Sequence, residues 1–379
     1  MNLFIVASID PFHAEAGGTK SFVMGMLNSL SCRGYLPTLV GLTHTDSREM
    51  IPDKFRFIPV LNTNNSKVSS YYFLFQLFLK VSFMHISSNT IIHVQREDHL
   101  LPFILFCRRN PKLCTLHGNS ADKMYLKKGK LVGRIYIEVE KFALIRVDKI
   151  IAVDKGTRDY YVSKYKWLDE KIEVVPIGID LTLFRPMPKN EMKKKYGLEY
   201  EKIIVFIGRQ EKEKNLHFLL NAFKNLKYEK RSCCLLLVGS GREHDALKEE
   251  AFRQNLKNVV FMDTLEHKYI PEILNCADVF ALCSLFESGP LVVQEAIACG
   301  VPVVSTNVGR VKDFIADEHI GKIVDYDEIE FARALDTYLS LGSNDIAHIR
   351  GIAENFSFNK TADSFIEIYK KLSKNGKLV

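Results

Sequence analysis

Short apolar runs alternate with segments of helical periodicity along most of the chain. Runs such as Ile172–Gly178 (IEVVPIG) and Lys202–Gly208 (KIIVFIG) end at turn residues and predict buried strands. The segment Lys20–Arg33 carries apolar residues three and four positions apart and stops at Gly34, which predicts a helix. Because strands that alternate with helices build parallel sheets covered on both faces, the pattern predicts a doubly wound α/β fold.

This alternation is interrupted once. The segment Ile179–Asn190 (IDLTLFRPMPKN) has two prolines and little periodicity, as expected of a linker. The same alternation then begins again at Lys202. We therefore expect two Rossmann-like domains, residues 1–180 and 181–358, and a C-terminal helix, residues 359–379. A length of 379 residues also favours two domains of ordinary size.

Composition narrows the classes of function. The net charge of +7 is mildly basic and does not indicate nucleic acid as a partner; a Lys-rich surface, an anionic ligand or anionic lipid each explains it. The eight cysteines form no C-x-x-C pair and are interpreted as reduced core thiols of a cytoplasmic protein. The apolar N-terminus lacks a basic region and predicts a first strand, and no apolar run is long enough to span a membrane.

Two segments of the first half leave alternatives open. Tyr71–Ile86 (YYFLFQLFLKVSFMHI) is the most apolar stretch of helix length, either a core helix, which its near-uniform apolarity favours, or a surface helix that dips into lipid. Lys123–Lys149 holds eight Lys or Arg and three Asp or Glu. It is either a solvated basic face or a patch for anionic lipid or an anionic acceptor.

The strongest chemical signal lies in Cys283–Gly300 (CSLFESGPLVVQEAIACG). It predicts a loop after a buried strand and then a helix, with Glu287 in the loop and Glu295 in the helix. A carboxylate can accept hydrogen bonds from two adjacent hydroxyls, as on a ribose or a hexose. The free N–H groups at the helix start, near Leu291 and Val292, suit a phosphate. Taken alone, two glutamates are more simply a loop residue and a helix surface residue.

Other candidates follow predicted strand ends in the second half: Arg209, Lys214, Gly239 and Gly241. The carboxyl ends of parallel strands meet at one edge of a sheet, where open α/β sheets bind ligands. Two cations and a helix dipole would neutralise a diphosphate, most of all as a leaving group gains charge. Such a site needs no metal, and no Asp-x-Asp lies in a position to hold one.

The first half contributes weaker candidates. Gly17 and Gly18 lie between a predicted strand and a helix, as in a phosphate-binding loop or in a plain tight turn. His117 ends the predicted strand Leu113–His117 and could face a ligand. Four other histidines are interpreted as structural: His44, His85, His93 and His99.

Together these motifs resemble the retaining family 4 glycosyltransferases, which have the GT-B fold. GRQEKEK (Gly208–Lys214) resembles the family's G-R-x-x-x-x-K, and Glu287 and Glu295 match its E-x7-E. Further similar segments are the glycine turn VGSG (Val238–Gly241), the linker VPIGID with Phe184 and Pro186, the N-terminal loop AGGTKSF (Ala16–Phe22), and the closing segment FSFNKTADSFIEIYKKL (Phe356–Leu372).

The resemblance implies two Rossmann-like domains that face a central cleft, the first binding the acceptor and the second a UDP- or GDP-linked sugar. It also implies that the C-terminal helix packs back on the first domain. It implies transfer of a hexosyl group to a hydroxyl with retention of configuration, without metal or cofactor. The implied catalytic residues are Glu287, His117, Arg209 and Lys214. The implied donor-binding residues are Gly17, Gly18, Arg209, Lys214, Gly239, Gly241, Glu287, Gly289, Leu291, Val292 and Glu295.

This sequence departs from the family pattern at two positions. Ile177 stands where the linker usually has Asn, and Pro290 stands where Gly is common and provides no N–H. The expected acceptor is a glycan or a lipid-linked molecule. The expected location is the cytoplasm, with contact to an anionic membrane at the inner face of the cell membrane left open. Two other functions remain: a sugar-nucleotide epimerase of related fold, and an inactive nucleotide-sugar binder, against which the intact motif residues argue.

Overall fold

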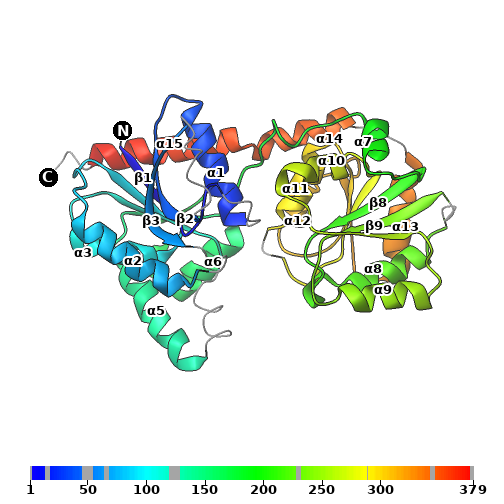
Figure 1. Ribbon diagram of the computed structural model, residues 1–379, viewed down its shortest axis with the longest axis horizontal. Coiled ribbons are helices and arrows are strands. Elements are labelled where there is room, and N and C mark those ends of the chain that lie inside the picture. The colour runs from blue at the N-terminus through cyan, green and yellow to red at the C-terminus, as the bar shows by residue number, and fades with distance from the viewer. Residues whose placement is uncertain are drawn as a thin grey trace. The chain divides into compact units, whose positions relative to one another are not determined.

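Two parallel β-sheets form the framework of the protein. The computed structural model describes residues 2–12, 18–44, 54–63, 68–118, 129–227, 232–287, 289–341 and 346–375. The chain divides into a first unit, residues 1–178 and 358–379, and a second unit, residues 179–357 (Figure 1). The expected fold class, two doubly wound α/β halves, is confirmed.

The first sheet has seven strands in the order β3-β2-β1-β4-β5-β6-β7, all parallel. Its strands are β1 (Leu3–Val6), β2 (Thr38–His44), β3 (Arg56–Thr63), β4 (Ile91–Val94), β5 (Lys112–Leu116), β6 (Lys149–Ala152) and β7 (Ile172–Val174). The central strands are buried on both faces because helices cover both, which explains their continuous apolar runs.

Helices cover the two faces of this sheet unequally. One face packs against α2 (Ser70–Phe83), α3 (Leu101–Phe106), α5 (Lys130–Ile145) and α6 (Lys155–Lys164), with the short 3-10 turns η2 (Glu97–Leu100) and η3 (Lys166–Leu168). The other packs against α1 (Gly18–Ser31) and α15 (Phe358–Asn375). The C-terminal helix therefore completes the core of the first unit.

Close packing between α1 and α15 depends on a glycine. A Cβ on Gly25 would lie 2.2 Å from the ring of Phe358, so only glycine leaves room for that ring. Arg33, just after α1, donates to Asp363 at 2.7 Å and to the carbonyl of Asn359 at 3.0 Å. These contacts hold the last helix of the chain against the first.

The second sheet has six parallel strands in the order β10-β9-β8-β11-β12-β13. Its strands are β8 (Lys202–Ile207), β9 (Cys233–Val238), β10 (Val259–Met262), β11 (Val279–Leu282), β12 (Val303–Thr306) and β13 (Gly321–Val324). The order runs outward from β8 in one direction and from β11 in the other. The boundary between β8 and β11 is thus the topological switch point of the sheet.

Helices again cover both faces. One core contains residues of α10 (Ile270–Leu274), α11 (Leu291–Ala298), α12 (Val311–Phe314) and α14 (Ile346–Ala353). The other contains residues of α8 (Leu216–Lys224), α9 (His244–Arg253) and α13 (Glu328–Leu341). The remaining elements are α7 (Lys189–Lys195), η4 (Lys212–Lys214), η5 (His267–Tyr269) and η6 (Glu354–Phe356).

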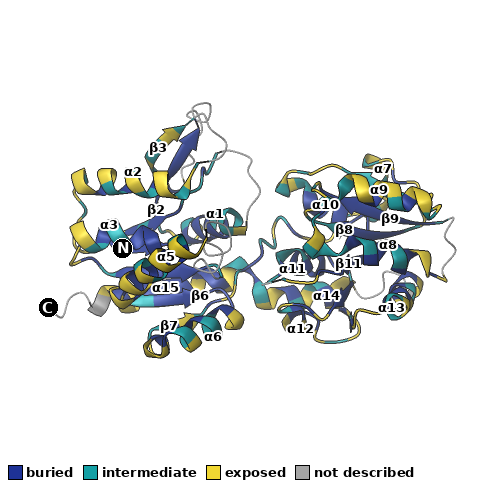
Figure 2. Cartoon of the chain, turned by 90° about the horizontal axis from the view of Figure 1, so that it is seen from below, coloured by how far each residue is buried: buried dark blue, intermediate teal, exposed yellow. Residues whose placement is uncertain are grey.

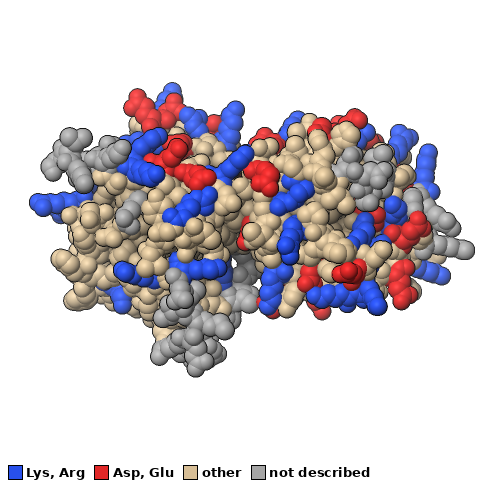
Figure 3. All heavy atoms as spheres, turned by 90° about the horizontal axis from the view of Figure 1, so that it is seen from above, with Lys and Arg blue, Asp and Glu red and all other residues tan. Residues whose placement is uncertain are grey.

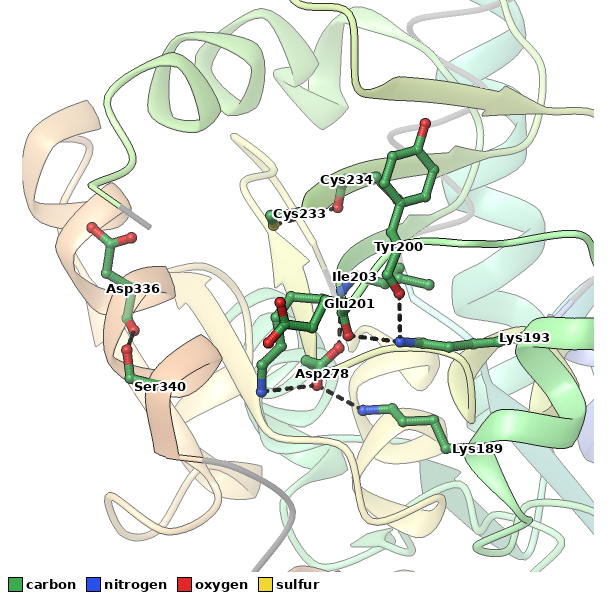
Figure 4. A network of polar contacts seen from close by, with 11 residues as sticks. Lys189, Lys193, Tyr200, Glu201, Ile203, Cys233, Cys234, Asp278, Asp336 and Ser340 are labelled. Carbon is green, nitrogen blue, oxygen red and sulfur yellow. Dashed lines mark hydrogen bonds and ion pairs between the residues drawn. The ribbon is translucent and has the colours of Figure 1, made fainter. Parts of the chain in front are cut away.

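A charged network fixes β8 beside β11 at the amino edge of the second sheet (Figure 4). Asp278, just before β11, accepts from the backbone N–H of Ile203 at 2.9 Å and from Lys189 at 2.8 Å. Lys193 donates to the carbonyls of Tyr200 and Glu201 immediately before β8. Because these contacts lie at the amino edge, the opposite edge of the same two strands is left for a ligand site.

The apolar segment of residues 71–86 is not a core helix. Only Phe73, Leu77 and Val81 are buried in α2. Five large apolar side chains of α2 are exposed: Tyr71, Tyr72, Phe75, Leu79 and Phe83. Helix α5 also exposes large apolar side chains, and both helices carry wide exposed faces (Figure 2). The interpretation of this segment as a core helix is therefore wrong, because the sheet covers one face of α2 alone.

Two further expectations concern the cysteines and the membrane. All eight cysteines are free thiols and all except Cys32 are buried, as predicted for reduced core thiols. Within the described ranges, the helices are too short or too polar to cross a bilayer.

Candidate active site

The candidate site lies at the carboxyl edge of the second sheet, around its switch point. The loop after β8 carries Arg209 and Lys214, and the loop after β11 carries Glu287. A backbone hydrogen bond from Leu285 to the carbonyl of Glu213, at 2.8 Å, joins these two loops. Crevices at switch points are where open α/β sheets bind ligands, so the fold places the predicted charges at the expected position.

Lys214 and Glu287 form an ion pair across the switch point. Lys214 Nζ lies 2.5 Å from Glu287 Oε1, and the two side chains are only 16% and 15% exposed. The Ser284 hydroxyl donates to the same oxygen at 2.8 Å. Glu287 is thus held by two donors in a partly desolvated position, where a charge interaction is stronger than in water. The structure brings together a cation and a carboxylate that the sequence predicted separately.

Arg209 does not join this pair. Its side chain is 74% exposed, and its Nη2 lies 3.3 Å from Oε1 of Glu213 on the same loop. An exposed ion pair of this kind contributes at most about 1 kcal/mol. A doubly charged phosphate group could therefore displace Glu213 from Arg209 at little cost.

The glycine turn after β9 packs against the loop after β8. A Cβ on Gly239 would lie 2.1 Å from the carbonyl oxygen of Gly208, and one on Gly241 would lie 2.2 Å from that of Gln210. Gly239 also has a φ of +129°, which other residues rarely adopt. The need for glycine at both positions is thus already explained by backbone packing within the site.

Gln210, which the sequence reasoning missed, fixes this contact. It is fully buried, its amide nitrogen donates to the carbonyl of Gly239 at 2.8 Å, and its amide oxygen lies 2.7 Å from Nδ1 of His244. Its backbone N–H donates to the carbonyl of Ser240 at 2.9 Å. Gln210 therefore sets the position of Arg209 relative to the glycine turn. The one signal in the sequence that could have indicated Gln210 is its place between Arg209 and the charged residues Glu211–Lys214.

Helix α11 begins beside the Glu287 loop. Pro290 is its N-cap residue, and Leu291 and Val292 are its first residues, half-buried. The first N–H groups of a helix have no partner within the helix, and they carry the positive end of its dipole. A Cβ on Gly289 would meet no atom within 4 Å, so this glycine is not required by packing among the described residues.

Glu295, on α11, has a different partner from Glu287. Its Oε1 accepts a hydrogen bond from Nε2 of His267 on η5 at 2.7 Å. The ring of His267 packs against Phe184, with 5.2 Å between ring centroids. Burial lowers the pKa of His267, but the hydrogen bond and charge of Glu295, with the charge of Asp180, outweigh it, so the pKa is raised. Sequence reasoning missed His267, because a lone histidine 28 residues away carries no pattern.

Gly309, in the loop after β12, packs against the backbone of the loop that carries Glu287. Its φ is +54°, and a Cβ there would lie 2.3 Å from the carbonyl oxygen of Glu287. The hydroxyls of Thr306 and Tyr326 donate to the carbonyl of Ser284 at 3.2 and 2.6 Å. The backbone around Glu287 is thus held by neighbouring strands, although Glu287 itself lies in a loop.

The predicted residues of the first unit lie at the carboxyl edge of its own sheet. His117 directly follows β5, its Nε2 lies 2.9 Å from the amide oxygen of Gln95, and its ring packs edge-on against Phe22 at 5.1 Å. Gly18 is the first residue of α1. Gly17 lies outside the described residues.

Among the residues that the structure describes, no three His, Cys, Asp or Glu side chains form a group that could hold a metal ion. The positive groups near the switch point are the side chains of Lys214 and Arg209 and the positive dipole end at the start of α11. This arrangement is suited to an anionic ligand that carries hydroxyl groups, with cations for its phosphates and carboxylates for its hydroxyls.

Family models match both units of the chain. Residues 188–357 match the model described as glycosyl transferases group 1, and residues 16–183 match the model described as glycosyltransferase family 4. The chain therefore belongs to the family 4, group 1 glycosyltransferases, and its two parallel sheets form the GT-B fold of that family.

Known relatives and structures agree with this family. Over 245 residues the chain is 30% identical to the D-inositol 3-phosphate glycosyltransferase of Segniliparus rotundus, covering 61% of this chain and 54% of that protein. Over 259 residues it is 30% identical to the alpha-monoglucosyldiacylglycerol synthase of Streptococcus pneumoniae, covering 65% and 58%. The matches thus span about half the length of these curated relatives. The structure of Anabaena HepE in complex with UDP and glucose has the same fold, with a TM-score of 0.73 at 15% identity over 98% of this chain and 100% of that chain.

Proposed function

We propose that the protein is a retaining glycosyltransferase that moves a hexosyl group from a UDP-sugar to an acceptor hydroxyl in glycan, polysaccharide or glycolipid synthesis. The observation that carries this proposal is the Lys214–Glu287 pair at the switch point of the second sheet, beside the start of α11. Family membership supports the reaction class. The likeness to HepE, solved with UDP and glucose, favours UDP over GDP as the nucleotide.

In this proposal the diphosphate of the donor binds Lys214, Arg209 and the first N–H groups of α11. A lysine ammonium has three donors, so Lys214 can contact Glu287 and a phosphate oxygen at the same time. Arg209 turns from Glu213 to the phosphate. Glu295 accepts from the ribose hydroxyls, and Glu287 contacts the transferred sugar.

During transfer, the bond between the anomeric carbon and the β-phosphate oxygen breaks, and the acceptor oxygen bonds to that carbon on the same face. The proton of the acceptor hydroxyl passes to an oxygen of the leaving phosphate. The leaving diphosphate gains charge as the bond breaks, and this charge is what Lys214 and Arg209 stabilise. The protein thus acts by positioning and electrostatic stabilisation and supplies no covalent nucleophile.

Incubation of the purified protein with a panel of nucleotide sugars tests this function. Release of nucleoside diphosphate that depends on an added acceptor, with the product anomer matching the donor by NMR, is the expected result. Conversion of the donor sugar without acceptor would indicate an epimerase. Donor binding without release or conversion would indicate an inactive binder.

We also propose that the acceptor is lipid-linked and that the first unit docks on an anionic membrane of the cell interior. Large apolar side chains on neighbouring helices α2 and α3 are exposed, with Phe83 at 89% and Phe75 at 57%. Helix α5 exposes Leu131, at 73%, and Ile135. These helices pack on the same face of the first sheet, shown in Figure 2.

Exposed basic residues accompany these apolar side chains: Lys80, Arg108, Arg109, Lys130, Arg134, Lys141 and Arg146. Each basic residue near an anionic surface contributes about 1 kcal/mol to binding. The opposite face of the first unit carries basic and acidic side chains interspersed (Figure 3). The combination of exposed aromatic and basic side chains on these helices therefore favours an anionic bilayer over a neutral one.

Vesicle flotation tests the docking. The protein should float with phosphatidylglycerol vesicles and much less with phosphatidylcholine vesicles, and the double variant Phe75→Ser, Phe83→Ser should lose this binding. A matched control is Phe252→Ser on α9 of the second unit, where the side chain is equally exposed, at 87%. Equal flotation on both lipids, or none on either, would contradict the proposal without affecting the transfer reaction.

A further inference from the structure

A chain of buried hydrogen bonds connects His117 to the C-terminal helix. His117 Nε2 lies 2.9 Å from the amide oxygen of Gln95, and the amide nitrogen of Gln95 lies 3.2 Å from Nε2 of His93. His93 Nδ1 lies 2.7 Å from the hydroxyl of Tyr369 on α15. Gln95, His93 and Tyr369 are at most 2% exposed. These contacts lie entirely within the first unit.

The chemistry of each group gives the chain a direction. An amide oxygen can only accept, so His117 Nε2 must donate to Gln95. The amide nitrogen of Gln95 can only donate, so Nε2 of His93 must accept. Burial lowers the pKa of His93 to about 3, with the charge of His117 acting in the same sense, so His93 is neutral and carries its one proton on Nδ1.

Tyr369 completes this arrangement. Its hydroxyl hydrogen is directed at the sulfur of Met26, 3.8 Å away, so its oxygen accepts from Nδ1 of His93. The hydroxyl of Thr115, 2.7 Å from Nε2 of His93, donates to the nitrogen that also accepts from Gln95. Every buried donor in this series of hydrogen bonds then has an acceptor. The opposite amide orientation of Gln95 would require both histidines to change tautomer.

We infer that Gln95 is a positioning residue that holds His117 in the tautomer with its proton on Nε2, and that His93 and Tyr369 fix the orientation of Gln95. In a neutral imidazole the other nitrogen, Nδ1, is then the acceptor. This inference deepens the proposed function and rests on it, since an acceptor nitrogen on His117 would receive a hydrogen bond from a hydroxyl of the transferred sugar. The edge-on contact with Phe22 fixes the plane of the ring.

NMR of the full-length protein labelled with ¹⁵N-histidine tests the tautomers directly. At about pH 8.5, roughly two units above the ordinary histidine pKa, long-range ¹H–¹⁵N spectra distinguish protonated from unprotonated ring nitrogens. Signals are assigned by their loss in His117→Asn and His93→Asn. We expect the proton on Nε2 in His117 and on Nδ1 in His93. A proton on Nδ1 of His117 would overturn the inference.

Tyr369→Phe tests the relay, because it removes one oxygen and keeps the ring. His93 then has no acceptor for its Nδ1 proton, so the proton should move to Nε2 and bind Thr115. Gln95 should turn over, and His117 should change tautomer. The matched control is Tyr161→Phe, which removes another fully buried hydroxyl from the first unit, one that donates to Glu140 at 3.2 Å. An unchanged His117 spectrum in folded Tyr369→Phe would overturn the role of Tyr369.

Kinetics separate this inference from the proposed function. Gln95→Leu and Tyr369→Phe should each lower kcat about tenfold, the value of one hydrogen bond, with little change in KM for the donor, whereas Tyr161→Phe should not. If the His117 tautomer changes as expected in Gln95→Leu but transfer continues at the wild-type rate, the positioning chain is supported. The side chain of His117 would then have no role in the transfer reaction.

Discussion

His267 donates a hydrogen bond from Nε2 to Glu295 Oε1 at 2.7 Å, so the carboxylate expected to hold the donor ribose is already held by a histidine. Only one of the two carboxylate oxygens is involved in this contact. His267 therefore orients Glu295 through one carboxylate oxygen only. The pair thus bears both on the stability of the fold and on ligand binding.

The first prediction concerns pH. The folded-state pKa of His267 is raised above its ordinary value of 6.5, so its pairing with Glu295 stabilises the fold fully below about pH 6.5. This contribution is lost as the pH rises through the folded-state pKa. Urea unfolding of wild type and His267→Asn should therefore show a larger stability difference at pH 6 than at pH 9. A difference that grows with pH would contradict the assignment.

A second prediction separates the roles of the two glutamates. The ribose contact exists before and during transfer, so Glu295→Gln should raise KM for the donor with a smaller loss in kcat. Glu287→Gln should lower kcat roughly 150-fold, which is about 3 kcal/mol in the barrier, because the charge near the sugar changes during transfer. Steady-state kinetics and calorimetric binding of UDP measure both. Loss of UDP binding in Glu287→Gln with retention in Glu295→Gln would reverse the roles.

Removal of the cations is the third prediction. Lys214→Ala and Arg209→Ala should each slow transfer by about 3 kcal/mol in the barrier, since each cation faces the charge that develops on the leaving group. Lys214→Ala should also lower stability, because it leaves Glu287, only 15% exposed, without its cation. Lys212→Ala, an exposed lysine on the same turn, is the control and should retain activity. Near-normal turnover in both test variants would remove these residues from the site.

Gly309→Ala provides a fourth test, one that touches no ligand. The added Cβ would meet the carbonyl oxygen of Glu287 at 2.3 Å and would require a φ of +54° that alanine adopts poorly. We expect a folded protein with displaced Glu287 and a kcat reduced at least tenfold. Gly351→Ala, on α14 with no atom within 4 Å of the new Cβ, should be active and slightly more stable. Full activity in Gly309→Ala would show that the loop tolerates displacement.

The fifth prediction concerns a buried acid in the first unit. Burial raises the pKa of Glu97 to about 7, with the charges of Asp98 and Glu140 acting in the same sense. The folded protein thus keeps a proton that the unfolded chain releases near pH 4.5. The free energy of unfolding therefore falls as the pH rises from 4.5 to about 7, by about 3 kcal/mol in total. Glu97→Gln should remove this pH dependence and be more stable than wild type at pH 8. Thermal unfolding at pH 5 and pH 8 measures both effects.

The sequence by itself predicted the strands, several of the longer helices and the identity of the charged residues near the site, whereas helices such as α6 and α14 had no prediction. Continuous apolar runs such as Lys202–Gly208 predict strands buried on both faces, and Gly34 and Gly300 predict helix ends, where the structure gives both glycines positive φ values. The placement of Arg209, Lys214 and Glu287 at strand ends follows from the same local patterns. A parallel sheet then brings these ends to one edge.

Only the tertiary structure decided which of these groups meet. Lys214 and Glu287 are 73 residues apart, and His267 and Glu295 are 28 apart, so no local pattern joins either pair. The same holds for the glycines: Gly239 and Gly241 are required by the carbonyls of the neighbouring loop, which the sequence does not place there. Exposure of α2 was misjudged for a related reason. Periodicity describes one helix, whereas burial depends on which of its faces the rest of the fold covers.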